Sequence, residues 1–226
     1  MSGNKSVFAQ AVDRHKNGEA YTLGPYASLD LVGDPRHLFI ALARYKFCSK
    51  MLAGRQRVLE VGCGDGLGLE LILQTCSKVT AIDLEPAIIQ YNQEHNRYPD
   101  RLEFEARDII ARPYQAEFDA ALSLDVLEHI APEQENDFLR HLGQSLQQQA
   151  PCLIGTPNIT ASAYASEGSR REHINLKSHE TLLASLTPHF HNIFIFSMND
   201  ELVHTGFYPM AHYLMALAVG PKHPAE

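Results

Sequence analysis

The stretch VLEVGCGDGLG, residues 58–68, decides the fold of this chain. An apolar run leads into a segment with glycine at every second position from Gly62 to Gly68. This pattern predicts a buried strand that enters a tight turn, where glycine permits positive φ angles and the close approach of a ligand. A second strand, residues 78–83, ends in Asp83 about 20 residues later, the distance at which a βαβ unit presents a carboxylate to ribose hydroxyls. The stretch therefore predicts a site for a nucleotide-like ligand.

Two acidic residues in this motif distinguish between such ligands. Glu60 lies inside the strand, and Asp65 interrupts the glycines where a pyrophosphate-binding turn avoids negative charge. S-adenosylmethionine (SAM) has no phosphate and carries a sulfonium and an ammonium, so acidic residues near it are favourable. The motif resembles the first motif of the class I SAM-dependent methyltransferases. A dinucleotide site or a purely structural turn is the alternative.

The composition is typical of one soluble globular domain. The chain has 226 residues, 45% of them hydrophobic, and no apolar run approaches the roughly 18 residues that a membrane span requires. Its formal charge of −8 argues against a large nucleic-acid partner, which needs a concentrated positive surface. The N-terminus lacks the apolar centre of a signal peptide, and the four cysteines show no pairing or metal spacing. We expect a cytoplasmic protein with reduced, buried thiols, present as a monomer or a homodimer.

Alternating apolar strands and amphipathic helices predict an α/β fold with a doubly wound, mostly parallel sheet. From Gly66 onward the chain reads as a helix (66–76), a strand (78–83), a helix (85–95), and strands at 102–107, 118–125 and 150–158. Residues 191–198 and 212–220 lie too close together for a parallel crossover, so we expect them to form an antiparallel final hairpin. The resemblance covers residues 57–220 and implies a Rossmann-like sheet of seven strands with the same ending.

Two regions follow from this assignment. Residues 1–52 are expected to form an N-terminal cap or lid, with a loop-rich stretch at 18–35 and an amphipathic helix at 36–52. Residues 53–226 are expected to form the methyltransferase domain that the resemblance implies.

The resemblance also implies a set of residues that bind SAM and its product S-adenosylhomocysteine. The glycine turn is expected to hold the methionine part and Asp83 the ribose. Asp108 is expected near the adenine, although aspartate at that position also suits the N-cap of the segment that follows. Tyr21 and Tyr26 are candidates to cover the cofactor. The full set is Glu60, Gly62, Cys63, Gly64, Asp65, Gly66, Asp83, Leu84, Asp108, Ile109, Leu124 and Tyr21.

The sequence DVLEHI, residues 125–130, follows the fourth strand and carries the candidate catalytic groups. Asp125, Glu128 and His129 share one face if a helical turn begins there. Together with His173, from the loop after the fifth strand, they form a mixed oxygen and nitrogen set that suits Mg²⁺ or Mn²⁺. Without a metal, His173 or His129 is the first choice of general base, with Asp125 beside it. Packed, hydrogen-bonded roles for Glu128 and His129 are the structural alternative.

The loop 156–177 and the connection 199–212 are expected to form the acceptor pocket, because long loops at this edge of the sheet carry specificity. A pair of arginines in the first loop can bind a phosphate or a carboxylate. The candidate acceptor residues are Tyr164, Arg170, Arg171, His204 and Tyr208.

These observations predict a SAM-dependent methyltransferase that acts on a hydroxyl oxygen of a small or medium polar acceptor, such as a sugar, a phosphate-bearing compound or a natural product. The turn at Glu128 and His129, and the strand exit TPN at 156–158, resemble ubiquinone-pathway O-methyltransferases. The combination of this turn with a later histidine also resembles metal-dependent RNA 2′-O-methyltransferases, which is the first alternative. The second is a SAM-binding protein without catalytic activity. Sequence motifs do not distinguish oxygen from nitrogen as the methylated atom.

Overall fold

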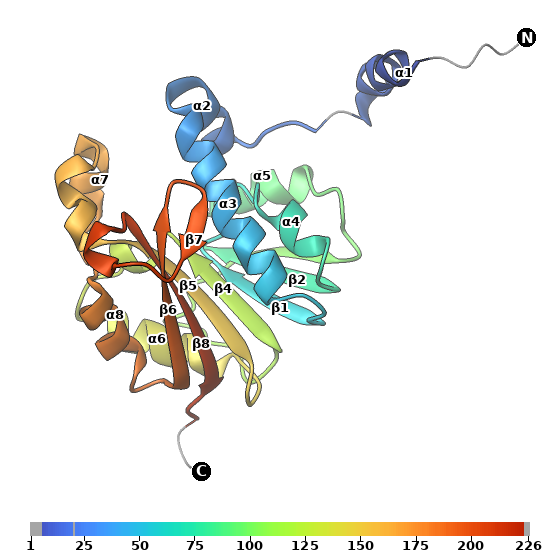
Figure 1. Cartoon of the computed structure of the whole chain (residues 1–226). Coiled ribbons are helices and arrows are strands. Elements are labelled where there is room, and N and C mark those ends of the chain that lie inside the picture. The colour runs from blue at the N-terminus through green and yellow to red at the C-terminus, as the bar shows by residue number, and fades with distance from the viewer. Residues whose placement is uncertain (1–5, 20, 224–226) are drawn as a thin grey trace, which may run out of the picture.

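The structure is a computed structural model that describes residues 6–19 and 21–223. One mixed sheet forms its centre, and helices pack on both faces of that sheet (Figure 1). The strand order is β3-β2-β1-β4-β5-β8-β6-β7. The strands are β1 (Arg57–Val61), β2 (Lys78–Asp83), β3 (Leu102–Ala106), β4 (Ala120–Leu124), β5 (Pro151–Pro157), β6 (Phe190–Asn199), β7 (Leu202–His204) and β8 (Tyr213–Pro221). The α-helices are α1 (Val7–Arg14), α2 (Pro25–Gly33), α3 (Pro35–Met51), α4 (Leu69–Leu73), α5 (Pro86–Glu94), α6 (Glu135–Gln144), α7 (Glu167–Glu172) and α8 (His179–Leu186).

The parallel half of the sheet confirms the doubly wound α/β prediction. Strands β3, β2, β1, β4 and β5 are parallel neighbours, and β8 runs antiparallel to both β5 and β6. The predicted final hairpin is therefore present. The connection between its strands adds the short strand β7, which extends the seven predicted strands to eight.

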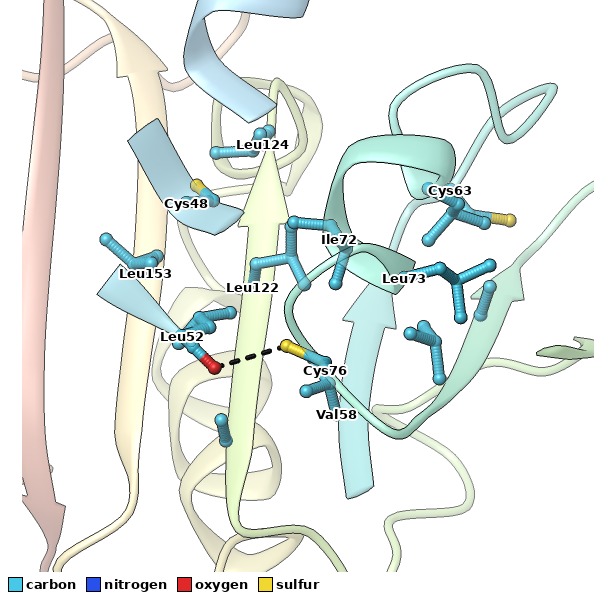
Figure 2. Packing of buried hydrophobic residues seen from close by; sticks show 14 of the residues in the cluster. Cys48, Leu52, Val58, Cys63, Ile72, Leu73, Cys76, Leu122, Leu124 and Leu153 are labelled. Atoms are coloured by element: carbon cyan, nitrogen blue, oxygen red, sulfur yellow. Dashed lines mark hydrogen bonds between the residues drawn. The ribbon is translucent and has the colours of Figure 1, made fainter. Parts of the chain in front are cut away.

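Two hydrophobic clusters, one on each face, hold the helices against the sheet. On one face, α3 and α4 contribute Cys48, Leu52 and Ile72 to a cluster with the strands (Figure 2). In that cluster the thiol of Cys76 donates a hydrogen bond of 3.1 Å to the carbonyl oxygen of Leu52. The other cluster contains Phe138 from α6 and Leu182 from α8, among others. All four cysteines are free and buried, as expected.

The prediction of a loop-rich stretch at 18–35 is wrong for its second half, because Pro25–Gly33 forms helix α2. Pro25 occupies the first helical turn, where its fixed φ angle is favourable. The side chain of Asp65 accepts a hydrogen bond of 2.8 Å from the Ala27 N–H in that turn. The free N–H group of Ala27 at the start of the helix is therefore paired by a residue 38 positions away. The sequence of residues 18–35 alone does not reveal this contact.

Among the residues that the structure describes, no helix is long and apolar enough to span a bilayer.

Candidate functional site

A cavity of about 520 Å³ lies where β1, β2 and β4 end. In an open α/β sheet, ligands bind outside the carboxyl ends of the parallel strands. We call this space the cofactor cavity. Its lining includes Tyr26, Val61, Gly62, Gly64, Ile82, Asp83, Leu84, Arg107, Asp108, Ile109, Ile110, Asp125, Val126, His129, Ile130, Phe138 and Glu172.

The glycine turn forms the floor of this cavity, and its conformation requires glycine. Gly62 has a φ of +80°, and a Cβ there would lie 2.2 Å from Cγ2 of Val126. Gly64 has a φ of +51°, and a Cβ there would lie 3.5 Å from the ring of Tyr26. The bare backbone of the turn therefore leaves room for a ligand between the strand ends and helix α2.

Asp83 lies beside this turn and is held by backbone donors. Its Oδ2 accepts a hydrogen bond of 2.9 Å from the Gly64 N–H, and its Oδ1 accepts one of 3.0 Å from the Glu85 N–H. A carboxylate oxygen has two acceptor positions, so each oxygen retains one for a ligand hydroxyl. The side chain is oriented before any ligand arrives.

The end of β3 and the segment after it supply the opposite wall. Asp108 lines the cavity, and its Oδ1 accepts a hydrogen bond of 2.8 Å from the Ile110 N–H. Asp108 therefore both lines the cavity and caps the segment that follows it. Ile109 is buried and Leu84 is exposed, and both line the cavity.

The remaining six predicted cofactor residues do not line this cavity. Glu60, Cys63 and Leu124 are buried below it. Asp65, Gly66 and Tyr21 line a neighbouring hollow of about 250 Å³ instead. Tyr26, rather than Tyr21, is the tyrosine at the cofactor cavity.

Glu60 is fully enclosed and hydrogen-bonded to the helix layer. The Tyr45 hydroxyl donates to its Oε1 at 2.6 Å, and its Oε2 has no hydrogen-bond partner among the residues that the structure describes. Burial raises the pKa of Glu60 to about 8, because the surroundings replace little of the hydration that its charged form loses. Glu60 is therefore buried and does not line the cofactor cavity.

Asp125 directly follows β4 and has a left-handed conformation with a φ of +57°. A helical turn beginning at Asp125 was expected to place Asp125, Glu128 and His129 on one face. The structure instead has a 3-10 turn that covers only Leu127–His129, so Asp125 lies outside it. The carboxylate of Asp125 forms an ion pair of 2.6 Å with Arg44 of α3. Asp125 therefore lines the cavity as the partner of a buried arginine.

Three of the four predicted metal ligands converge. Glu128, His129 and His173 each offer a ligand atom, and these atoms lie within 4.8 Å of one another. Asp125 lies outside this group, which we call the EHH cluster. Oε2 of Glu128 accepts a hydrogen bond from Thr156, whereas its buried Oε1 has no hydrogen-bond partner within the described part of the chain.

The two histidines of the EHH cluster face each other. Their ring centroids are 5.0 Å apart, and the rings are nearly perpendicular. Nδ1 of His129 lies 3.2 Å from the carbonyl oxygen of Glu172, which can only accept. In the neutral ring Nδ1 therefore carries the proton and Nε2 is the free acceptor. Burial and the neighbouring His129 lower the pKa of His173, which favours its neutral form.

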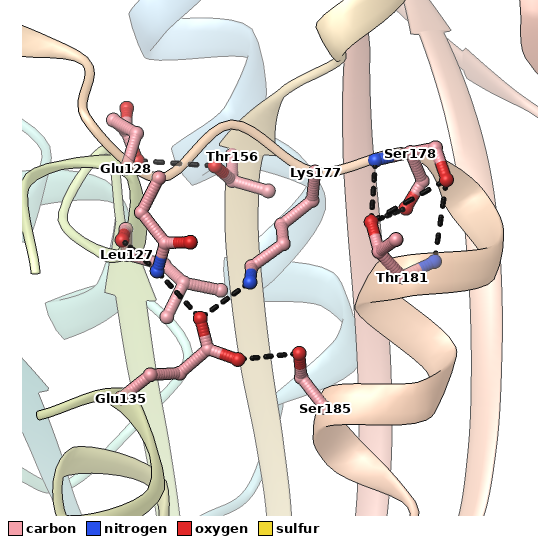
Figure 3. Close-up of polar contacts among 9 residues, drawn as sticks. Leu127, Glu128, Glu135, Thr156, Lys177, Ser178, Thr181 and Ser185 are labelled. Atoms are coloured by element: carbon pink, nitrogen blue, oxygen red, sulfur yellow. Dashed lines mark hydrogen bonds and ion pairs between the residues drawn. The ribbon is translucent and has the colours of Figure 1, made fainter. Parts of the chain in front are cut away.

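The segment after His173 is tied to the turn that carries Glu128. The carbonyl oxygen of Glu128 accepts hydrogen bonds from the N–H groups of Ile174 and Asn175, at 2.9 and 3.0 Å. Further along, Glu135 pairs with Lys177 and accepts a hydrogen bond from Ser185 of α8 (Figure 3). These contacts bring His173 to His129 across 44 residues of sequence.

The predicted acceptor residues lie outside the cofactor cavity. The loop 156–177 contains a 3-10 turn, Ile159–Tyr164, and helix α7. Tyr164 is 91% exposed, and Arg170 donates to the carbonyl oxygen of Ala165. His204 is hydrogen-bonded to Asn199 and to the Gly206 N–H, and Tyr208 stacks on His179. Arg171 is exposed.

Sequence reasoning missed several residues at the site. Val126 sits against Gly62, and Glu172 orients His129 through its backbone, so neither has a side-chain signature. Arg44 is a single buried cation in an otherwise ordinary amphipathic helix. Its position among apolar residues of the helix is the feature of the sequence that could have indicated a buried charge.

Comparison with known proteins shows which proteins this chain is similar to. Residues 59–152 match the family model described as a methyltransferase domain. A ubiquinone biosynthesis O-methyltransferase of Xanthomonas oryzae is 30% identical over 117 residues, 50% of this chain and 48% of that protein. The mitochondrial ubiquinone biosynthesis O-methyltransferase of Schizosaccharomyces pombe is 27% identical over 123 residues, 53% of this chain and 44% of that protein. The match thus spans about half the length of these relatives.

A solved structure shows the same fold. The N-methyltransferase NodS of Bradyrhizobium japonicum, in complex with S-adenosylhomocysteine, superposes with a TM-score of 0.60 at 19% identity. The superposition covers 85% of this chain and 91% of that one. The chain therefore carries a methyltransferase domain with the Rossmann-like fold of SAM-dependent methyltransferases, which confirms the predicted family and fold class.

Proposed function

We propose that this methyltransferase-domain protein transfers the methyl group of SAM to a hydroxyl oxygen of a polar acceptor. One observation carries the proposal: the cofactor cavity is lined both by the glycine turn with Asp83 and by Asp125 with His129. The proposed nucleoside-binding groups and the proposed base His129 thus line one cavity.

The cavity residues suggest how SAM would lie. The glycine turn would hold the methionine part, Asp83 would accept the ribose hydroxyls, and Asp108 with Ile109 would contact the adenine. The methyl group would then face the end lined by Asp125 and His129. The apolar residues Val126, Ile130 and Phe138 also line the cavity and would shield bound SAM from water.

Methyl transfer is an in-line displacement in which the sulfur–carbon bond breaks while the acceptor oxygen forms a bond to the same carbon. S-adenosylhomocysteine leaves with the electron pair, and the acceptor hydroxyl gives up its proton. Without a bound cation, the proposed bases are His129, which lines the cavity, and His173, whose ring centroid lies 5.0 Å from that of His129. The protein's tasks are to align the acceptor and to take this proton.

Oxygen as the methylated atom is supported by the curated relatives, which are named O-methyltransferases. A small acceptor is supported by the formal charge of −8, because a nucleic acid requires a concentrated positive surface. Salt-sensitive binding of a short RNA would instead favour the RNA 2′-O-methyltransferase, and absence of turnover with every hydroxyl acceptor tried would favour a non-catalytic SAM-binding protein.

The cofactor part of the proposal is tested by titrating S-adenosylhomocysteine in a calorimeter. Asp83→Ala is expected to lower the affinity about tenfold or more, because a hydrogen bond to a charged group contributes about 1.5–3 kcal/mol. The matched control is Asp119→Ala, since Asp119 also accepts two backbone N–H hydrogen bonds, at the start of β1. Equal affinities of Asp83→Ala and the unmodified protein would remove the ribose role of Asp83.

We also propose that the EHH cluster binds a divalent cation such as Mg²⁺ or Mn²⁺. The buried Oε1 of Glu128 lacks a partner, and one carboxylate with two imidazoles is a suitable donor set. A bound cation would lower the pKa of an acceptor hydroxyl. Titration with Mn²⁺, followed by electron paramagnetic resonance, is expected to show binding that His173→Ala abolishes and His179→Ala retains. Equal Mn²⁺ affinity in the His173 variant would contradict this site.

A further inference from the structure

Arg44 is the buried cation of helix α3, and neither the proposed cofactor contacts nor the EHH cluster uses it. Its side chain is 7% exposed, whereas the other described cations of this helix, Arg36, Lys46 and Lys50, are exposed. Removing a guanidinium from water is unfavourable unless a partner compensates for the lost hydration. The contacts of Arg44 therefore indicate what this buried charge is for.

Its partner is Asp125, which is 81 positions away in the sequence. Nη1 of Arg44 donates to Oδ2 of Asp125 at 2.6 Å. The guanidinium also lies over the ring of Tyr213, the first residue of β8, with 3.8 Å between its Cζ and the ring centroid. The arginine thus joins α3 to the ends of β4 and β8.

The backbone of Asp125 explains why such a partner is needed. A φ of +57° is unfavourable for a residue with a Cβ, and aspartate tolerates it better than most. The Asp125 N–H donates to the carbonyl oxygen of Gly155 at 3.1 Å, so the residue is held at its backbone and at its carboxylate. The turn that follows carries Val126, which meets Gly62, and then Glu128 and His129.

We infer that Arg44 is a positioning residue for the proposed methyl transfer. By pairing with Asp125 it holds that residue in the left-handed conformation and so sets the direction in which the 125–129 turn leaves β4. This turn forms one wall of the cofactor cavity and carries two members of the EHH cluster. The inference rests on the proposed function, because the cavity must bind the cofactor for the position of this wall to matter.

The ion pair also accounts for a departure from the sequence hypothesis. Asp125 was expected to bind a metal with Glu128, His129 and His173. Its carboxylate is instead directed to Arg44, which leaves the three residues of the EHH cluster. Arg44 thus takes the Asp125 carboxylate, and Glu128 is the carboxylate that lies with the two histidines.

The test is a double-mutant cycle read out by S-adenosylhomocysteine affinity. Arg44→Met is expected to weaken binding at least tenfold, and Asp125→Gly is expected to weaken it because Arg44 loses its partner. Glycine adopts a φ of +57° without a restraining ion pair. The double variant is therefore expected to bind within about threefold of the unmodified protein, because two residues in contact do not act additively. A role of Arg44 in packing α3 alone would not be rescued by glycine at position 125.

Two further variants keep the outcome clear. Arg57→Met is the matched control, because Arg57 forms an exposed ion pair with Glu117 at the start of β1, and its affinity is expected to be unchanged. If Arg44→Met does not fold, Arg44→Lys replaces it in the double-mutant cycle, because lysine preserves the buried positive charge. If the unmodified protein binds and Arg44 variants bind equally well, or if the two single effects simply multiply, the positioning role is wrong. If the unmodified protein does not bind, the proposed function itself fails.

Discussion

Replacing Gly62 by alanine tests whether the glycine turn is built as the structure indicates. Two separate penalties apply to this change. An alanine at a φ of +80° is less stable than glycine by about 1–2 kcal/mol. In addition, its Cβ would lie 2.2 Å from Cγ2 of Val126, so one of the two must move. Overpacking of this kind destabilises a protein by about 1–3 kcal/mol.

The two penalties together predict that Gly62→Ala loses about 2–5 kcal/mol of unfolding free energy. For a chain of this length about 1 kcal/mol shifts the melting temperature by about 2–4 °C, so we expect a decrease of about 4–20 °C. The assay is thermal and urea denaturation without ligand, followed by calorimetric titration of S-adenosylhomocysteine. Binding is expected to weaken as well, because Val126 lines the cofactor cavity.

A matched glycine separates the two penalties. Gly54 has a φ of +85°, and a Cβ there would have no heavy atom within 4 Å. Gly54→Ala therefore carries only the conformational penalty of about 1–2 kcal/mol. Shortening Val126 to alanine in the Gly62→Ala background is expected to recover part of the difference. Gly62→Ala as stable as Gly54→Ala would refute the close contact with Val126.

Three other changes probe the buried polar groups. Because burial raises the pKa of Glu60 from 4.5 to about 8, the folded state binds a proton that the unfolded chain releases, and the free energy of unfolding should fall as the pH rises from about 5 to about 8. Glu60→Gln should make that fall shallower in urea denaturation at pH 5, 6.5 and 8, and an equally steep fall would contradict the assignment. Lys177→Met leaves Glu135 nearly buried without its cation and should lower the unfolding free energy by about 3–5 kcal/mol, whereas Arg140→Met at an exposed pair should change it by less than about 1 kcal/mol. Adding Glu135→Leu to Lys177→Met should restore most of the loss, and a further decrease would count against the pair as its cause.

Much of the fold could be predicted from residues close together in the sequence. The alternation of strands and helices requires only local periodicity, and the glycine turn requires only the torsional freedom of its residues. Asp83 could be placed beside that turn because the length of a βαβ unit determines where its second strand ends. Six of the predicted cofactor residues line the cavity, because they lie at or just after the ends of these strands.

The rest of the site depends on contacts between distant residues, which local patterns do not encode. The start of α2 is satisfied by Asp65, so a stretch with loop composition becomes a helix and brings Tyr26, rather than Tyr21, to the cavity.

The sequence by itself determined the parallel sheet, its antiparallel ending and the pairing of glycine turn with Asp83, because periodicity and backbone torsion act over a few residues. Only the tertiary structure decided that Asp125 pairs with Arg44 and that Glu128 stays with the two histidines. The physical reason is that a buried charge pairs with the group that packing places within reach, and for the guanidinium of Arg44 that group is Asp125, 81 residues later.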